Sequence, residues 1–166
     1  MNLEPRHLRL LGQFQLLEFS LKLYISFSHE IIRSKLDGAI PFKYEFEQID
    51  GYPLEKLLAN FKLLNDNVEL QARLGKLIKK RNVVAHKALL FQDLGFTNLV
   101  AGLYNIDHRE LLRDLDETES EVDGCMEQLA PELAGVKKNM PQRGPDDSFK
   151  PKPLRPPQDG LKPATT

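Results

Sequence analysis

Apolar residues recur every three or four positions through two long proline-free stretches, residues 6–40 and 54–130. This spacing is typical of an α-helix with one apolar face, because successive residues are about 100° apart around the axis. It predicts a first helix over about residues 8–36, ending at Asp37-Gly38, and a second helix that begins at Leu54. The first helix would bury six residues on one face: Leu10, Phe14, Leu17, Leu21, Ile25 and Ile32.

The same spacing predicts a third and a fourth helix. Asn65-Asp66-Asn67 has the composition of a break followed by a new N-cap, so the third helix should begin there. Glu110 follows Asp107 by three residues, which predicts a capping box and a fourth helix that begins at Asp107. The connector 37–53 has room for a short extended piece, and residues 90–106 fit a helix, a hairpin or a loop. Four amphipathic helices with short connections predict an all-α bundle of four to five helices.

Composition separates the last thirty residues from the rest of the chain. Seven of the eleven prolines lie in residues 137–166, with seven Lys/Arg against three Asp/Glu, whereas residues 1–136 hold 16 Lys/Arg against 21 Asp/Glu. A segment with so few large apolar residues cannot offset the entropy lost on ordering. We therefore expect a helical domain over residues 1–136 and a disordered, basic, proline-rich tail over residues 137–166.

The overall composition excludes several classes of protein. Cys125 is the only cysteine, which excludes a disulfide framework and a thiolate-rich zinc site. The formal net charge of −1 gives no global attraction to nucleic acid or membranes. No apolar run reaches the roughly 18 residues that span a bilayer, and no signal peptide is recognisable, so a cytoplasmic protein is expected. The histidines (His7, His29, His86 and His108) lack metal-ligand spacing, and no phosphate-binding or dinucleotide-binding glycine motif occurs, so we expect no metal and no cofactor.

The predicted third helix carries a charged residue inside its apolar stripe. On a helical wheel Arg81 lies between Leu74, at about +20°, and Leu77, at about −40°. A buried guanidinium without a partner is costly, so either the aliphatic stem packs and the head reaches water, or a carboxylate or phosphate contacts it. Glu18 falls inside the apolar stripe of the first helix. We therefore expect an ion pair between Glu18 and Arg81; the alternative is that Glu18 lies at the edge of its stripe, in solvent. Because guanidinium geometry suits phosphate, the pair would also aim Arg81 at an anion.

Asn82 and His86 are four residues apart and share one face of the same helix. His86 lies about 140° around the helix from Arg81, so an ideal helix does not present both to one ligand. Two arrangements would bring them together. Either the helix unwinds or kinks between them, or each chain of a symmetric dimer contributes one of the two residues to a shared site.

The segment Lys79-Lys80-Arg81-Asn82-Val83-Val84-Ala85-His86-Lys87 resembles the motif of the HEPN superfamily. That motif is an Arg, commonly followed by a polar residue, with a His after four to six intervening residues, on a helix of a four- or five-helix bundle. The helix order over residues 8–130 is similar as well. The resemblance implies metal-independent RNA cleavage by the neighbouring 2′-hydroxyl, in a homodimer, with a 2′,3′-cyclic phosphate as product. It assigns catalysis to Arg81 and His86. From their side chains, Asn82 would donate to a phosphate oxygen or orient His86, Lys80 and Lys87 would add positive charge for binding phosphate or RNA, and Glu18 would support Arg81 through the ion pair.

Several functions are compatible with this resemblance. A toxin, a phage-defence protein and an RNA-processing enzyme are all open, as is an antitoxin or regulatory protein partner. One HEPN branch has a modified tyrosine two residues after the histidine, but Ala88 occupies that position here. The acidic domain favours a non-catalytic module that binds a nucleotide, RNA or protein, since strong RNA binding normally shows a basic surface. A third alternative is a helical interaction protein in which Arg81 is structural.

Overall fold

The computed structural model describes residues 4–36, 39–44, 46–90 and 108–141; the side chains of Glu4, residues 86–90, His108 and Leu111 lie outside this description. Every regular element in these ranges is an α-helix, which confirms the all-α bundle. In chain order the helices are α1 (Glu4–Leu36), α2 (Phe46–Asp50), α3 (Leu54–Leu64), α4 (Val68–Leu90) and α6 (His108–Lys138). Within the described ranges, none of them has both the length and the apolar character needed to cross a membrane.

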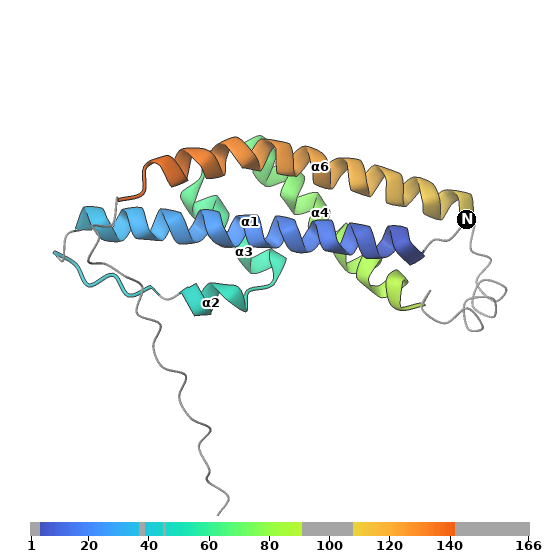
Figure 1. Cartoon of the computed structure of the whole chain (residues 1–166), viewed down its shortest axis with the longest axis horizontal. Coiled ribbons are helices and arrows are strands. Elements are labelled where there is room, and N and C mark those ends of the chain that lie inside the picture. Colours follow the sequence, from blue (N-terminus) through green and yellow to red (C-terminus); the bar gives the residue numbers. More distant parts are fainter. Residues whose placement is uncertain (1–3, 37–38, 45, 91–107, 142–166) are drawn as a thin grey trace, which may run out of the picture.

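The two longest helices, α1 and α6, lie side by side and run in the same direction (Figure 1). Arg6 pairs with Asp116, and seven residues further along both helices, about two turns, Gln13 donates a hydrogen bond to Asp123. Both contacts therefore join residues that are 110 positions apart in the sequence. Because each helix rises 1.5 Å per residue, a constant offset means that the two helices are parallel and stay in register. The helices α3 and α4 cross this parallel pair at an angle (Figure 1).

The core lies between α1, α3, α4 and α6, and the predicted apolar stripes supply it. Ile32 is the exception on α1: it is only half-buried, because it lies near the end of the helix in an open groove with Val136 of α6. The buried residues include Leu10, Phe14, Leu17, Leu21, Ile25, Leu54, Leu57, Leu58, Phe61, Leu70, Leu74, Leu77, Val84, Leu115, Val122 and Leu129.

Side-chain amides fix the connection between α3 and α4. The Oδ1 atom of Asn67 accepts a hydrogen bond from the Leu70 N–H at 3.1 Å, which confirms the predicted N-cap. The side-chain amides of Asn67 and Asn65 also donate hydrogen bonds to the Glu132 carboxylate of α6, at 2.9 Å and 3.0 Å. The start of α4 is therefore held against α6 by hydrogen bonds to a charged group, which are stronger than those between neutral groups.

Three element boundaries differ from the sequence-based expectation. The first helix begins at Glu4 rather than near residue 8, because Pro5 is tolerated in a first helical turn. The connector 37–53, in which a short extended piece was possible, contains the short helix α2. An ion pair of 3.0 Å between Lys22 and Asp50 holds α2 against α1. The last helix, α6, runs to Lys138, two residues past the expected end of the helical domain at residue 136. The expected capping box at Asp107, the conformation of residues 91–107 and the tail from residue 142 onward lie outside the described residues.

Candidate functional site

Arg81 lies on the face of α4 that is turned toward α1. Its Nε atom is 3.4 Å from Oε1 of Glu18, which confirms the predicted ion pair between the first and third long helices. The Glu18 side chain is 18% exposed and that of Arg81 is 41% exposed, so the pair lies at the rim of the core. Both expected explanations for a charge in this stripe therefore apply: a carboxylate contacts the guanidinium, and the guanidinium reaches solvent. Leu77 and Val84 beside it are buried, but the long aliphatic stem of arginine carries its charge out to the surface.

Asn82 connects Arg81 to a third helix. The Nη1 of Arg81 donates to Oδ1 of Asn82 at 3.4 Å, and Nδ2 of Asn82 donates to Oε1 of Glu55, on α3, at 3.5 Å. Both distances are long for hydrogen bonds, so these contacts are weak. The first two motif residues thus lie between two carboxylates, one from α1 and one from α3. Nothing in the sequence around Glu55 indicated this contact, which depends on how α3 crosses α4.

The backbone of α4 is helical without interruption from Val68 to Leu90. The arrangement in which the helix unwinds between Arg81 and His86 is therefore not observed. Their positions stay about 140° apart around the axis, so one chain does not present both on one face. The side chains of His86 and Lys87 lie outside the described residues, and their assigned roles stay predictions.

The two lysines that precede Arg81 have different surroundings. The Nζ atom of Lys80 is 2.9 Å from Oε1 of Glu121, so Lys80 forms an ion pair with α6, whereas Lys79 is exposed. Glu121 is one of several acidic residues in this part of α6. Lys80 would therefore have to exchange a carboxylate for a phosphate in order to contact RNA.

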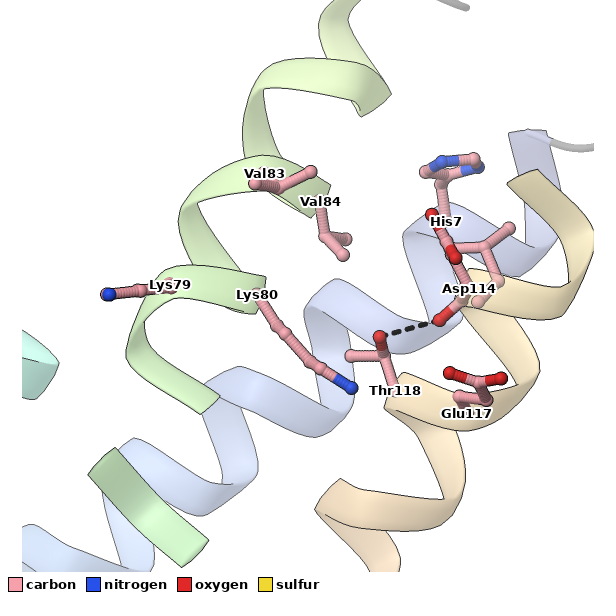
Figure 2. Close-up of a pocket in the computed structure, with 9 residues that line it drawn as sticks. His7, Lys79, Lys80, Val83, Val84, Asp114, Glu117 and Thr118 are labelled. Carbon is pink, nitrogen blue, oxygen red and sulfur yellow. Dashed lines mark hydrogen bonds between the residues drawn. The ribbon is translucent and has the colours of Figure 1, made fainter. Parts of the chain in front are cut away.

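A cleft of about 290 Å³ opens between α4, α6 and the first turns of α1 (Figure 2). Its apolar part comes from Val83 and Val84 of α4 and Leu115 of α6. The remaining lining residues are polar or charged: His7, Lys79, Lys80, Asp114, Glu117 and Thr118. The Thr118 hydroxyl donates to the backbone oxygen of Asp114 at 2.6 Å and so bonds within α6.

Sequence analysis did not single out two buried residues of this cleft, His7 and Thr118. The helical spacing of both residues could have indicated that they are buried. His7 is three residues before Leu10, and Thr118 is three residues after Leu115, so each falls in a stripe that is otherwise apolar. A buried polar residue in such a stripe marks a place where the core opens or a hydrogen bond forms.

Other side-chain chemistry is sparse in the described part of the chain. Cys125 is fully buried, and burial raises the pKa of its thiol, which suits a core residue rather than a nucleophile. No group of three or more His, Cys, Asp or Glu side chains in the described ranges is arranged to hold a metal ion. The best candidate for chemistry is therefore the surface around Arg81.

Comparison with protein-family models, with curated proteins and with solved structures finds no match for this chain. The resemblance to the HEPN superfamily consequently depends on the motif of residues 79–87 and on its place in the bundle.

Proposed function

We propose that this protein is a metal-independent endoribonuclease of the HEPN type that acts as a homodimer. The observation that carries the proposal is the surface position of Arg81, held by Glu18 at 3.4 Å and by Asn82. These contacts engage Nε and Nη1 of the guanidinium. The Nη2 group makes no hydrogen bond or ion pair among the described residues, and it is the group that would donate to a phosphate oxygen.

The proposed reaction uses side chains alone. The 2′-hydroxyl attacks the adjacent phosphorus, its proton passes to a base, and the leaving 5′-oxygen takes a proton from an acid. A histidine whose pKa is near the usual value of about 6.5 serves either role near neutral pH, which suits His86. Arg81 would stabilise the charge that develops on the phosphorane, because its planar N–H groups match two phosphate oxygens. Asn82 would donate to the same phosphate.

A second copy would complete the site, since one chain separates Arg81 from His86. The face of α1 opposite the core supports dimer formation, because Leu8, Leu16 and Phe19 are 52%, 54% and 50% exposed there. Exposed apolar residues that gather on one helical face are typical of an interaction surface. Arg9 and Glu18 lie beside this face, and each already has an ion-pair partner within the chain. Their charges therefore do not oppose the burial of this face in a dimer.

The same face is complementary to itself. With a two-fold axis beside residue 14 and antiparallel α1 helices, Gly12 of one copy faces Leu16 of the other, and Leu8 lies one residue, about 1.5 Å along the helix, from the level of Phe19. A Cβ atom added at Gly12 would have no neighbour within 4 Å, so the backbone there is open to close approach. Glu18 is four residues from this axis, about 6 Å along the helix, so the two Glu18–Arg81 pairs would border one groove.

A non-catalytic binding module is the second candidate, and one observation favours it. Glu18 and Glu55 already contact the two motif residues that would hold a phosphate, which weakens the attraction of the site for RNA. In either case we propose a cytoplasmic role in toxicity, phage defence or RNA processing, with an antitoxin or other regulatory protein as a further partner.

Incubation of the purified full-length protein with end-labelled RNA in EDTA tests the proposal. Wild type should cleave, with a 2′,3′-cyclic phosphate at the new end, and Arg81→Ala and His86→Ala should not. Arg33→Ala is the matched control: Arg33 forms an ion pair with Glu30, and its exposure of 51% is close to that of Arg81. RNA binding without cleavage would favour the module, and neither activity would favour the structural interaction protein.

Sedimentation of a second pair of variants tests the dimer. Phe19→Asp should give a monomer and lose cleavage, because it places a charge in the centre of the proposed interface. Leu63→Asp should change neither property, although Leu63 is 84% exposed, because it lies on α3, away from this face. A wild-type protein that sediments as a monomer while it cleaves RNA would contradict the two-chain site.

A further inference from the structure

We propose that the cleft between α4 and α6 binds a guanine base of the RNA; this inference rests on the proposed function and names the nucleotide that the enzyme selects. The cleft lies on a different face of α4 from Arg81; α4 contributes Lys79, Lys80, Val83 and Val84 to it, and the other lining residues come from α6 and, for His7, from α1. It would therefore select a base without taking part in the chemical step.

The size and lining of the cleft suit a small ligand with an apolar face and a polar edge. Its volume of about 290 Å³ is near the lower end of the range for small-molecule sites, which are mostly apolar with a few polar groups. Val83 and Val84 lie on the α4 side, and Asp114 and Glu117 lie across from them on α6 (Figure 2). A base that enters between them packs its face against the valines and turns its edge toward the carboxylates.

The carboxylates decide which base is favoured. An ionised carboxylate only accepts hydrogen bonds, and its two oxygens match two adjacent N–H donors. Guanine offers such a pair, N1–H and the N2 amino group, on its Watson–Crick edge. Adenine and cytosine place an acceptor beside their amino group, and uracil places acceptors on both sides of its single N–H. Proteins that bind single-stranded RNA commonly recognise this edge of an unstacked base.

Glu117 is the carboxylate best placed for this contact. Its side chain is 61% exposed, and its ion pair with Arg113, one helical turn earlier, has a long N–O distance of 3.8 Å. Such an exposed pair is weak, so a ligand can displace Arg113. Lys79, exposed at the rim, would meet the sugar–phosphate backbone where it leaves the cleft.

Titration of the full-length protein with GMP, AMP, CMP and UMP, followed by calorimetry or NMR, tests the inference. We expect GMP to bind at least about tenfold more tightly than the other three, the discrimination typical of one two-bond contact. Glu117→Gln should reduce this preference to less than about threefold, because the amide offers only one acceptor. Glu127→Gln, an exposed position further along α6 and outside the cleft, should keep it. Val83→Glu should abolish binding, since it adds a charge to the apolar wall.

Equal affinities for the four nucleotides, or the same loss in Glu127→Gln as in Glu117→Gln, would overturn the inference. The proposed function fails separately. Wild type that prefers GMP but cleaves no RNA would refute the ribonuclease and leave the guanine site. Cleavage that requires Arg81 but shows no preference for guanine would refute the guanine site and leave the ribonuclease.

Discussion

The ion pair between Glu18 and Arg81 offers the sharpest test of whether this arginine serves the fold or a reaction. We would replace each residue by glutamine, alone and together, because glutamine keeps much of the side-chain length while it removes the charge. The double-mutant cycle then isolates the coupling free energy of the pair from the other effects of each change.

The structure sets the expected magnitude. The two charged atoms are 3.4 Å apart, but the arginine side chain is 41% exposed, so solvent screens the attraction. Pairs of this kind contribute about 0.2–1 kcal/mol, and we expect a coupling of about 0.5 kcal/mol in urea unfolding at low salt. At 1 M salt, where charges are screened within about 3 Å, the coupling should fall toward zero. The Arg33–Glu30 pair has similar exposure and should show a comparable value.

The effect on RNA cleavage should be much larger than the effect on stability. Arg81→Gln removes the phosphate contact and should abolish cleavage, while Glu18→Gln lets the guanidinium move and should reduce cleavage about tenfold or more. A merely structural pair would show the small stability loss with cleavage unchanged in both variants. If Glu18→Gln left both stability and cleavage at the wild-type level, the pairing hypothesis itself would be refuted.

Three further predictions concern the scaffold. Asn67→Ala removes the N-cap of α4 and should lower the free energy of unfolding by about 1 kcal/mol in urea; a loss below about 0.3 kcal/mol would contradict the cap. Gly135→Ala and Gly124→Ala should both raise the melting temperature, because alanine favours a helix over glycine by about 1 kcal/mol; a Cβ at residue 135 has nothing within 4 Å, and one at residue 124 meets only the end of the flexible Arg73 side chain, which can move aside, so a fall at Gly124 would refute this reasoning. Burial lowers the pKa of His29 below 6.5, so the unfolded chain binds more protons and the free energy of unfolding should decrease as the pH falls below about 6.5. His29→Phe should flatten that pH dependence, and an unchanged profile would exclude His29 as its source.

Local spacing predicted much of the fold because each long helix has a stripe that only burial explains. The stripe of the first helix located five buried residues of α1, and the two charges inside stripes predicted the contact between Glu18 and Arg81. That contact was predictable because both residues interrupt apolar faces that must meet. Helical spacing alone did not show how far the guanidinium reaches toward solvent, since this depends on the distance between the helices at that level.

The contacts that sequence did not predict are made by side chains on exposed faces. Glu55 meets Asn82 and Glu121 meets Lys80 only because of the angles at which α3 and α6 cross α4. Nor did local pattern predict that α6 continues through Pro131. A proline inside a helix typically costs about 3 kcal/mol, so tertiary contacts such as the two hydrogen bonds to Glu132 must offset it.

Net charge is a poor guide to whether this acidic protein binds RNA. The carboxylates of α6 are largely engaged with neighbouring helices; Asp116 pairs with Arg6 and Glu121 with Lys80. An ion pair has little field beyond its own dimensions, whereas an unpaired charge acts over a Debye length of about 8 Å at physiological salt. Lys76 and Lys79 are exposed on α4 and have no ion pair among the described residues, and they lie about 140° and 160° around the helix from Arg81. Their positive charge therefore acts on the side of α4 that carries the cleft, where the RNA backbone would leave the proposed guanine site, although the net charge of the chain is negative.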